Sequence, residues 1–414
     1  MKHVNPKLQF HILFASPLHN MNRDEDGQVK TAEFGGVGRG RVSSQARKRA
    51  IRFSSQFGNC SRSVRTREAG LKAFLELRSA GIHEATAIKF ALAVNVALGG
   101  SKDKVDDKAV ADLLAKEVKK ATDEKVKAGM EPADAREHAL LRALRTENGV
   151  VVTTVEFAAL DEAIEAVVAA KTAGKEAETV DAFVARAMKA GLLSKDRVDD
   201  DTLLFGRMVA SKPEFNVDAA CAISHAVTTH EFSVQGDYFS AGEEMNLLGE
   251  KGAAITAYAF FGAGVYYQHA VLDVRQIAES TGSDAARAER LVRSFFQGLV
   301  FAMPGGMRNA HASDVPASYV LVGAGGGETF NQMIAFLRPV QAGHNSDLLI
   351  ESMDRLPAAV QASYGRPVES LAFNGYPLSW EGRNSPVPET HNLEDLERFV
   401  VDYVLAQIGT PVTA

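Results

Sequence analysis

The strongest constraint on the fold is a change of pattern in the middle of the chain. From about residue 66 to residue 201, segments such as "KAVADLLAKEVKKATDEKVKAG" and "ADAREHALLRALR" place apolar residues at helical spacing. The turn-forming stretches "ALGGSKDK" and "GMEPAD" separate these segments. Shorter runs typical of β-strands stand on both sides of this block. We therefore expect an α+β domain that is interrupted by a small helical insertion.

The β-like runs lie near the start and in the second half of the chain. The stretch "LQFHILFAS" predicts an opening strand that Pro17 ends. After Leu203, the runs "CAISHAVTTHEFSV", "AYAFFGAGVYYQHAVLDV" and "ASYVLVGAG" alternate with amphipathic stretches such as "ARAERLVRSFFQGLVFAM". Near the end, Asn392 can cap a helix with an apolar stripe. That stripe consists of Leu393, Leu396, Phe399, Val400, Tyr403 and Val404.

Positive charge is concentrated in one early region of an acidic chain. The 414 residues carry a formal net charge of −6. Residues 22–67 contain 11 Lys and Arg against 4 Asp and Glu, a local charge of +7, so the remainder carries −13. An isolated charge run is usually a solvated helix face. A basic strip on an acidic body, however, is typical of a surface that binds a polyanion.

The centre of this region predicts a short basic helix. Ser43 or Ser44 can cap it. An expected apolar stripe consists of Ala46, Ala50, Phe53 and Phe57, and another face carries Gln45, Lys48, Arg49 and Arg52. Because helix N-termini accept anions, and because Lys48 and Arg52 are one turn apart, we expect contacts to a phosphodiester strand. Lys30, Arg39 and Arg41 from the preceding loop add to them.

Other chemistry has little support in the sequence. The glycines of "VLVGAGGGETF", residues 323–327, are too close for a dinucleotide-binding G-x-G-x-x-G motif. His225 and His230 stand five apart in a predicted strand and point to opposite faces, which does not suit one metal. The two cysteines, Cys60 and Cys221, show no metal-ligand spacing. We therefore expect no catalytic residues, no metal and no cofactor.

Several blocks resemble the Cascade backbone subunit of type I-E CRISPR systems, the CasC or Cas-seven family. The first is "NRDEDGQVKTAEFGG…RVSSQARKRAIR", residues 22–52, and the second is "LFGRMVASKPEFNVDAACAISHAVTTHEF", residues 204–232. The runs "FFGAGVYYQHAVLDV" and "MPGGMRNAHASDVP" are similar to the strand after the family's thumb hairpin and to its Pro-Gly segment. In this chain Arg47 replaces an apolar helix residue, Val37 and Gly38 replace a more basic loop, and Tyr238 replaces a Trp.

The resemblance implies a hand-shaped subunit. Its palm would be a modified ferredoxin-like or RRM-type fold with an inserted helical fingers domain and a thumb β-hairpin. The implied boundaries are 1–65 for the first part of the palm, 66–200 for the fingers, 201–230 for palm, 231–257 for the thumb and 258–414 for the rest of the palm. Several copies would form a helical filament along one CRISPR RNA (crRNA) and present the guide for pairing with target DNA.

The resemblance also implies roles for individual residues. The positions that match the family's guide-binding motif are Lys30, Ser43, Gln45, Lys48 and Arg52, with Asn22, Arg23 and Arg49 nearby; Arg39, Arg41 and Ser44 complete the RNA-binding set from the charge pattern. Arg207 and Met208 match the Gly-Arg-Met segment, where the Met would wedge beside a base. Tyr238, Phe239 and Ile255 would pack where the guide strand is kinked.

Three hypotheses follow, in order of preference. The first is a non-catalytic guide-RNA-binding subunit of an antiviral Cascade complex, with crRNA, target DNA, copies of itself and other Cascade subunits as partners. The second is a guide-RNA-processing endoribonuclease, which would need a His, Tyr or Ser acid/base set near the RNA. The third is a nucleotide-dependent oxidoreductase that uses residues 323–327. No apolar run is long enough for a membrane span and the start lacks a signal peptide, so a cytoplasmic location is expected.

Overall fold

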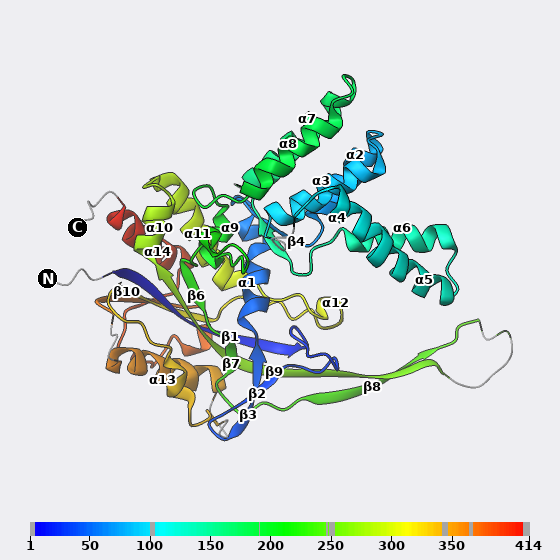
Figure 1. Cartoon of the computed structure of the whole chain (residues 1–414). Helices are drawn as coiled ribbons and strands as arrows, with labels where there is room; N and C mark the ends of the chain where they lie inside the picture. Colours follow the sequence, from blue (N-terminus) through cyan, green and yellow to red (C-terminus); the bar gives the residue numbers. More distant parts are fainter. Residues whose placement is uncertain are drawn as a thin grey trace. The chain divides into compact units, whose positions relative to one another are not determined.

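The computed structural model describes residues 5–99, 104–189, 191–245, 247, 253–341, 347–363 and 367–408 (Figure 1). The chain divides into two compact units. One joins Met1–Cys60 to Ala220–Ala414, and the other is Ser61–Ala219. The second unit is therefore inserted into the first, as the change of sequence pattern indicates. It extends beyond the expected range of 66–200 at both ends. The protein is of the mixed α+β class.

The first unit contains the large sheet and the helices that cover it. Its strands are β1 (Pro6–His19), β2 (Thr31–Phe34), β3 (Val37–Val42), β6 (Cys221–Ile223), β7 (Ala226–Thr228), β8 (Gln235–Gly242), β9 (Ala253–Asp273), β10 (Tyr319–Gly326), β11 (Glu369–Asn374) and β12 (Glu389–Thr390). Its helices are α1 (Ser44–Arg52), α10 (Val274–Ser280), α11 (Ala285–Phe301), α12 (Arg308–His311), α13 (Leu348–Ala362) and α14 (Leu393–Gln407). Short 3₁₀ segments lie at Ser55–Phe57, Gln332–Phe336 and Pro377–Ser379.

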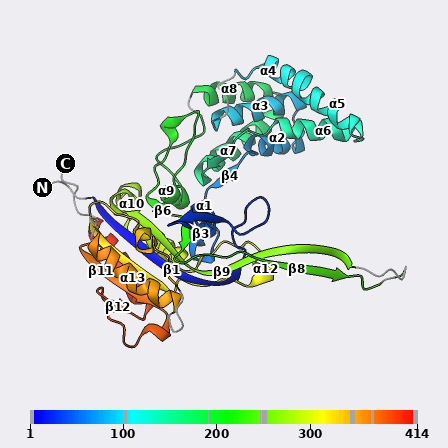
Figure 2. The ribbon, with the colours of Figure 1, turned by 90° about the horizontal axis from the view of Figure 1, so that it is seen from below.

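The strands follow the order β12-β11-β10-β1-β9-β7-β3-β2, with β6 and β8 also paired to β9. The two long strands β1 and β9 run side by side (Figure 2). In chain order, β1, α1, β7, β9, α11 and β10 form a β-α-β-β-α-β series whose strands stand as β10-β1-β9-β7. Neighbouring strands in this set are antiparallel. The second unit interrupts the series between α1 and β6.

Both faces of the sheet are covered, which explains why seven consecutive residues of β1, 8–14, are buried. On one face Phe10 packs edge-on against Phe295 of α11, with 5.9 Å between ring centroids. On the other face Leu13 and Tyr267 share a core with Met353 of α13. Figure 1 shows α10, α11 and α14 on one side and α13 on the other.

Two terminal features of the sheet unit test the sequence analysis. The strand β1 does not end at Pro17 but continues to His19, and its register with β9 shifts between Ser16 and His19. A β-bulge of this kind accommodates a proline within a strand. The expected helix cap is confirmed, because the Asn392 side chain accepts a hydrogen bond from Glu394 N at 3.1 Å. Leu396 is fully buried, as the predicted stripe requires.

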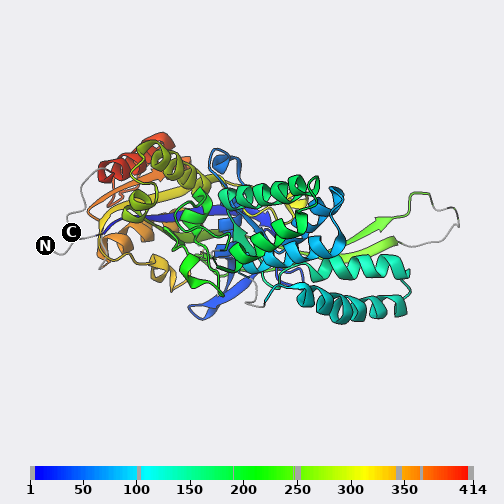
Figure 3. The same ribbon diagram turned by 45° about the horizontal axis from the view of Figure 1, so that its top comes forward.

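The strand β8 and the first part of β9 form a long antiparallel hairpin that extends from the sheet (Figure 3). Every residue of β8 is exposed. An exposed two-stranded ribbon has little apolar burial of its own, so β9 anchors it by continuing into the middle of the sheet. Residues 246 and 248–252 of the expected thumb lie outside the described residues.

The second unit is helical with one small sheet. Its helices are α2 (Ala69–Ser79), α3 (Glu84–Ala97), α4 (Asp107–Asp112), a π-helical segment (Leu113–Val118), α5 (Lys119–Lys127), α6 (Pro132–Ala143), α7 (Thr154–Lys171), α8 (Glu176–Lys189) and α9 (Asp200–Phe205), and its strands are β4 (Val64–Thr66) and β5 (Val150–Val152). Its core includes Phe90 and Phe183, whose rings stack with 4.3 Å between centroids. Thr153 and Glu156 form a capping box that starts α7.

Candidate nucleic-acid interface

The helix α1 begins where the sequence predicts. Ser43 is its N-cap, and the Ser43 hydroxyl accepts a hydrogen bond from Ala46 N at 3.3 Å. The first turn contains no acidic residue, and the last turn contains Arg49 and Arg52. The N-terminal N–H groups therefore keep a positive electrostatic potential that no local carboxylate neutralises.

The buried face of α1 is not the predicted one. Arg47 and Ile51 are fully buried, whereas Phe53, which we expected in an apolar stripe, is 52% exposed. The Arg47 guanidinium donates to Gln268 Oε1 and to Leu299 O, both at 2.9 Å, and also to Ala302 O. Burial lowers the pKa of Arg47 to about 10, so this residue stays charged at neutral pH. Because these hydrogen bonds satisfy its guanidinium, Arg47 can occupy a core position at which the resembling family has an apolar residue.

The start of α1 is tied to the loop after β1. The amide of Ser43 donates to Asn22 Oδ1 at 2.8 Å. Lys30 N donates to Asn22 O at 3.0 Å, and Arg41 N donates to Lys30 O at 2.8 Å. These bonds place four of the residues singled out from the sequence, Asn22, Lys30, Arg41 and Ser43, side by side. The structure thus gathers cations from the loop and from β3 at the N-terminus of α1.

A residue that the sequence analysis considered only as a metal ligand lies beside these cations. His225, exposed just before β7, accepts a hydrogen bond at Nδ1 from Ser44 N at 3.3 Å. Partial burial lowers the pKa of His225, and the positive charges of Arg41 and Lys30 lower it further. Since β7 pairs with β3, only the sheet topology brings position 225 to position 44. No local sequence pattern indicates this contact.

One expected phosphate ligand has a structural role instead. Arg39 is fully buried, and its guanidinium donates to the carbonyl oxygens of Phe34 at 3.1 Å, Thr228 at 3.0 Å and Phe336 at 2.9 Å. These carbonyls join β2, β7 and the Gln332–Phe336 segment. The expectation that Arg39 contacts phosphate is therefore corrected, because its donors are already used inside the unit.

The other expected residues of α1 and the loop are exposed or half-buried. Arg23 and Gln45 are exposed. Arg49 and Arg52 lie over the ring of Phe53, with 4.7 Å and 5.6 Å from guanidinium carbon to ring centroid. Lys48 lies near Cys221. Burial raises the pKa of the Cys221 thiol to about 12, and the positive charge of Lys48 acts on this pKa in the opposite direction. The exposed Arg49 and the half-buried Lys48 and Arg52 thus give α1 three cations that are accessible at least in part.

The β8–β9 hairpin carries a group of exposed apolar and aromatic side chains. In the β8–β9 register, Tyr238 is opposite Tyr258, with 5.4 Å between ring centroids. Phe239 lies on the other face of the ribbon, and so does Ile255, because strand side chains alternate. Tyr258 is 67% exposed. The sequence analysis did not single it out, although side chains that alternate along β9 share each face of the hairpin with side chains of β8.

In the second unit, Arg207 and Met208 have opposite environments. The Arg207 side chain is buried and forms an ion pair with Glu156 at 2.7 Å. It also donates to Ser194 O at 2.6 Å and to Phe215 O at 3.2 Å. The expectation that Arg207 contacts RNA is corrected, because this arginine joins three segments of the helical unit. Met208 is 80% exposed, as a residue that wedges beside a base would have to be.

Three other features were sought in the described residues: a dinucleotide-binding unit, a metal site and a membrane-spanning helix. The strand β10, which carries the glycines at 323–326, pairs antiparallel with β1 and β11, so it cannot belong to a parallel dinucleotide-binding unit. Across the described residues, no group of three or more His, Cys, Asp or Glu could hold a metal ion. No helix in the described part of the chain is long and apolar enough to cross a membrane.

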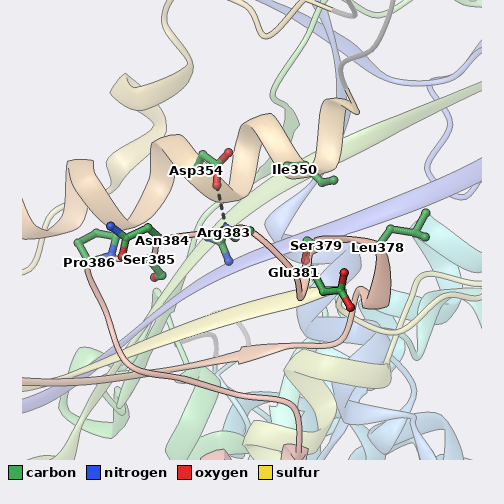
Figure 4. A pocket seen from close by; sticks show the side chains of 10 residues that line it. Ile350, Asp354, Leu378, Ser379, Glu381, Arg383, Asn384, Ser385 and Pro386 are labelled. Atoms are coloured by element: carbon green, nitrogen blue, oxygen red, sulfur yellow. Dashed lines mark hydrogen bonds and ion pairs between the residues drawn. The ribbon is translucent and has the colours of Figure 1, made fainter.

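A separate pocket of about 300 Å³ lies beside α13 in the first unit (Figure 4). Arg383 lines it and forms ion pairs with Asp354 at 2.8 Å and with Glu389. The carboxylate of Glu381 also lines it. With its one arginine paired and its walls acidic, this pocket does not suit a phosphate.

The fold is shared with chains from CRISPR assemblies. A chain of a structure described as "CRISPR RNA-guided surveillance complex, pre-nicking" matches with a TM-score of 0.70 and 21% identity, covering 96% of this chain and 100% of that one. A chain of a "CRISPR RNA-guided surveillance complex" matches with a TM-score of 0.61 and 19% identity, covering 97% and 99%. At such identities the likeness shows a common fold.

The sequence itself then gives the family. The model of the CT1975-like protein family of Cas proteins matches residues 8–369. Since this match spans most of the chain, the protein belongs to the CT1975-like family. No curated protein matches it.

Proposed function

We propose that this protein is the guide-RNA-binding backbone subunit of a Cascade complex, of the type I-E CasC kind. The observation that carries the proposal is the pair Lys30 and Arg41 beside the N-terminus of α1, whose first turn has no acidic residue, continued by Lys48 and Arg52. A strip of this kind binds the phosphates of a single strand without reading its bases. The fold shared with chains of RNA-guided surveillance complexes supports it.

The proposal also assigns the palm, the fingers and the thumb of a Cascade backbone subunit. The strand order β10-β1-β9-β7 with α1 and α11 supports a modified ferredoxin-like or RRM-type sheet as the palm. The helical unit would be the fingers and the β8–β9 hairpin the thumb. Several copies would line one crRNA in the cytoplasm and present it to target DNA for antiviral defence, together with other Cascade subunits and without a membrane partner.

The salt dependence of RNA binding tests the cationic strip. Lys48→Ala combined with Arg52→Ala removes two expected phosphate contacts. For single-stranded RNA, the slope of log affinity against log salt should become shallower by about 1.4. The matched control is Arg290→Ala with Arg398→Ala, which removes two cations from α11 and α14 of the same unit and should leave the slope unchanged. An unaltered slope in the Lys48 and Arg52 variant would contradict the assignment.

The endoribonuclease alternative rests on His225. This exposed histidine lies beside Ser44, Lys30 and Arg41, and its lowered pKa favours the neutral imidazole, which could act as a base only if Nδ1 released its hydrogen bond from Ser44 N. We expect no cleavage of guide or precursor RNA by the purified chain, with or without divalent metal. Reproducible cleavage that His225→Ala abolishes would replace the non-catalytic proposal with the enzymatic one.

A further inference from the structure

An open pocket of about 580 Å³ lies between α1 and the chain that follows α11. The helix contributes Ala46, Arg49, Ala50 and Phe53, which recur at helical spacing and form one face of α1. Phe301 and Arg308 line the opposite wall. These α1 positions include three of the four from which the sequence predicts an apolar stripe. That stripe exists, but it borders an open pocket instead of a core.

Two aromatic side chains are exposed at this pocket. Phe53 is 52% exposed and Phe301 is 42% exposed. The alanines at 46 and 50 add only methyl groups to the α1 side of the pocket. Exposed large aromatic residues in a concave site are more typical of ligand contact than of an ordinary surface.

The charges around the pocket are mainly positive. The Arg49 guanidinium lies 4.7 Å from the centroid of the Phe53 ring, and that of Arg52 lies 5.6 Å away. On the opposite wall Arg308 forms an ion pair with Asp314 at 2.6 Å. Among the residues that line the pocket, Arg49 and Arg308 stand against one carboxylate, that of Asp314, so the pocket favours an anionic ligand with a flat apolar part.

A nucleotide has both properties. Every nucleobase can stack on an aromatic ring or on a guanidinium plane, and its phosphates can contact arginine. The pocket volume lies within the range of about 300–1,000 Å³ that small-ligand sites show. Lys48 and Arg52 continue the cationic side of the same helix, so a strand bound there would have a base near Phe53.

We propose that this pocket takes one unstacked base of the single-stranded RNA bound along α1. Phe53 is the stacking platform, Phe301 closes the apolar side, and Arg49 contacts the adjoining phosphate. The contact is tolerant of base identity, because it uses the face of the ring. This inference rests on the proposed RNA-binding function and adds a base-binding subsite to it.

The test compares ring-removing and ring-keeping variants of the full-length chain. The probe is a single-stranded RNA of mixed sequence, titrated at several salt concentrations. Phe53→Leu keeps an apolar side chain but removes the ring, and should weaken binding by about 5-fold to 100-fold. Phe53→Tyr keeps the ring and should bind like the wild type. Phe301→Leu provides a second ring-removing variant on the other wall.

The salt series separates this inference from the proposed function. Because Phe53 contributes no phosphate contact, Phe53→Leu should leave the slope of log affinity against log salt unchanged. If both leucine variants bind RNA as tightly as the wild type, the subsite is wrong while the cationic strip stands. If they keep RNA affinity but lose self-association, the pocket binds a second copy of the chain. If the wild type binds no RNA, the proposed function itself fails.

Discussion

At the scale of single residues, Arg47 shows that a charged side chain in a basic run need not face the ligand. It is one of the four cations in "ARKRAIR", yet its guanidinium is fully buried and bonded to Gln268 and to backbone carbonyls. Arg39 and Arg207 repeat this pattern in other places. The sequence shows the excess of charge, but only tertiary contacts decide which cations remain at the surface.

This difference predicts a large loss of stability for one substitution and almost none for its neighbour. Arg47→Ala leaves Gln268 and two carbonyl groups without their donor, and should lower the free energy of unfolding by about 3 kcal/mol or more. Arg49→Ala, on the exposed side of α1, should change it by less than about 0.5 kcal/mol. Urea unfolding followed by the fluorescence of Trp380, the single tryptophan, reports on the unit that contains α1. Equal midpoints for the two variants would contradict the buried role of Arg47.

At the scale of elements, the sequence predicts α1 well because its determinants are local. Ser43 caps the helix in the structure, and it is one of the two caps that the sequence predicts. The orientation of α1 could not be predicted, since a helix with alanines on one side and Ile51 on another has two candidate apolar faces. The packing of Ile51 and Arg47 against α11 decides between them. The contact of His225 with Ser44 likewise depends on strand pairing.

The β8–β9 hairpin gives a prediction for assembly. Tyr238→Ser with Phe239→Ser alters exposed side chains on both faces of the ribbon, so the subunit should keep its stability to within about 0.5 kcal/mol. If the hairpin displaces guide nucleotides, ordered assembly should be impaired and the periodic pattern of unpaired nucleotides lost. Chemical probing of guide RNA in reconstituted assemblies measures this pattern.

The hairpin experiment has a matched control. Val126→Ser with Val155→Ser alters two exposed apolar residues of the helical unit and should leave the pattern intact. A periodic pattern that survives the hairpin substitutions would show that the β8–β9 ribbon is not a thumb.

At the scale of the whole molecule, the change from β-like to helical pattern was enough to predict an inserted unit. Its ends were not predictable, because Ser61 and Ser63 bond to Asp200 and Asp201 through contacts distant in sequence. These contacts extend the unit past the helical pattern itself. Charge patterning gave the place of the candidate interface. The open pocket at Phe53 could not be foreseen, since an exposed and a buried phenylalanine look alike in sequence.

We propose above all that this chain binds a CRISPR guide through Lys48 and Arg52 of α1. The most direct measurement is to purify the protein with its operon partners and to sequence the RNA recovered from it. We predict RNA of repeat and spacer sequence with the wild type, and a strong loss of that RNA when Lys48→Ala and Arg52→Ala are combined. Recovery of no RNA, or of bulk cellular RNA without enrichment of guide sequences, would contradict the claim.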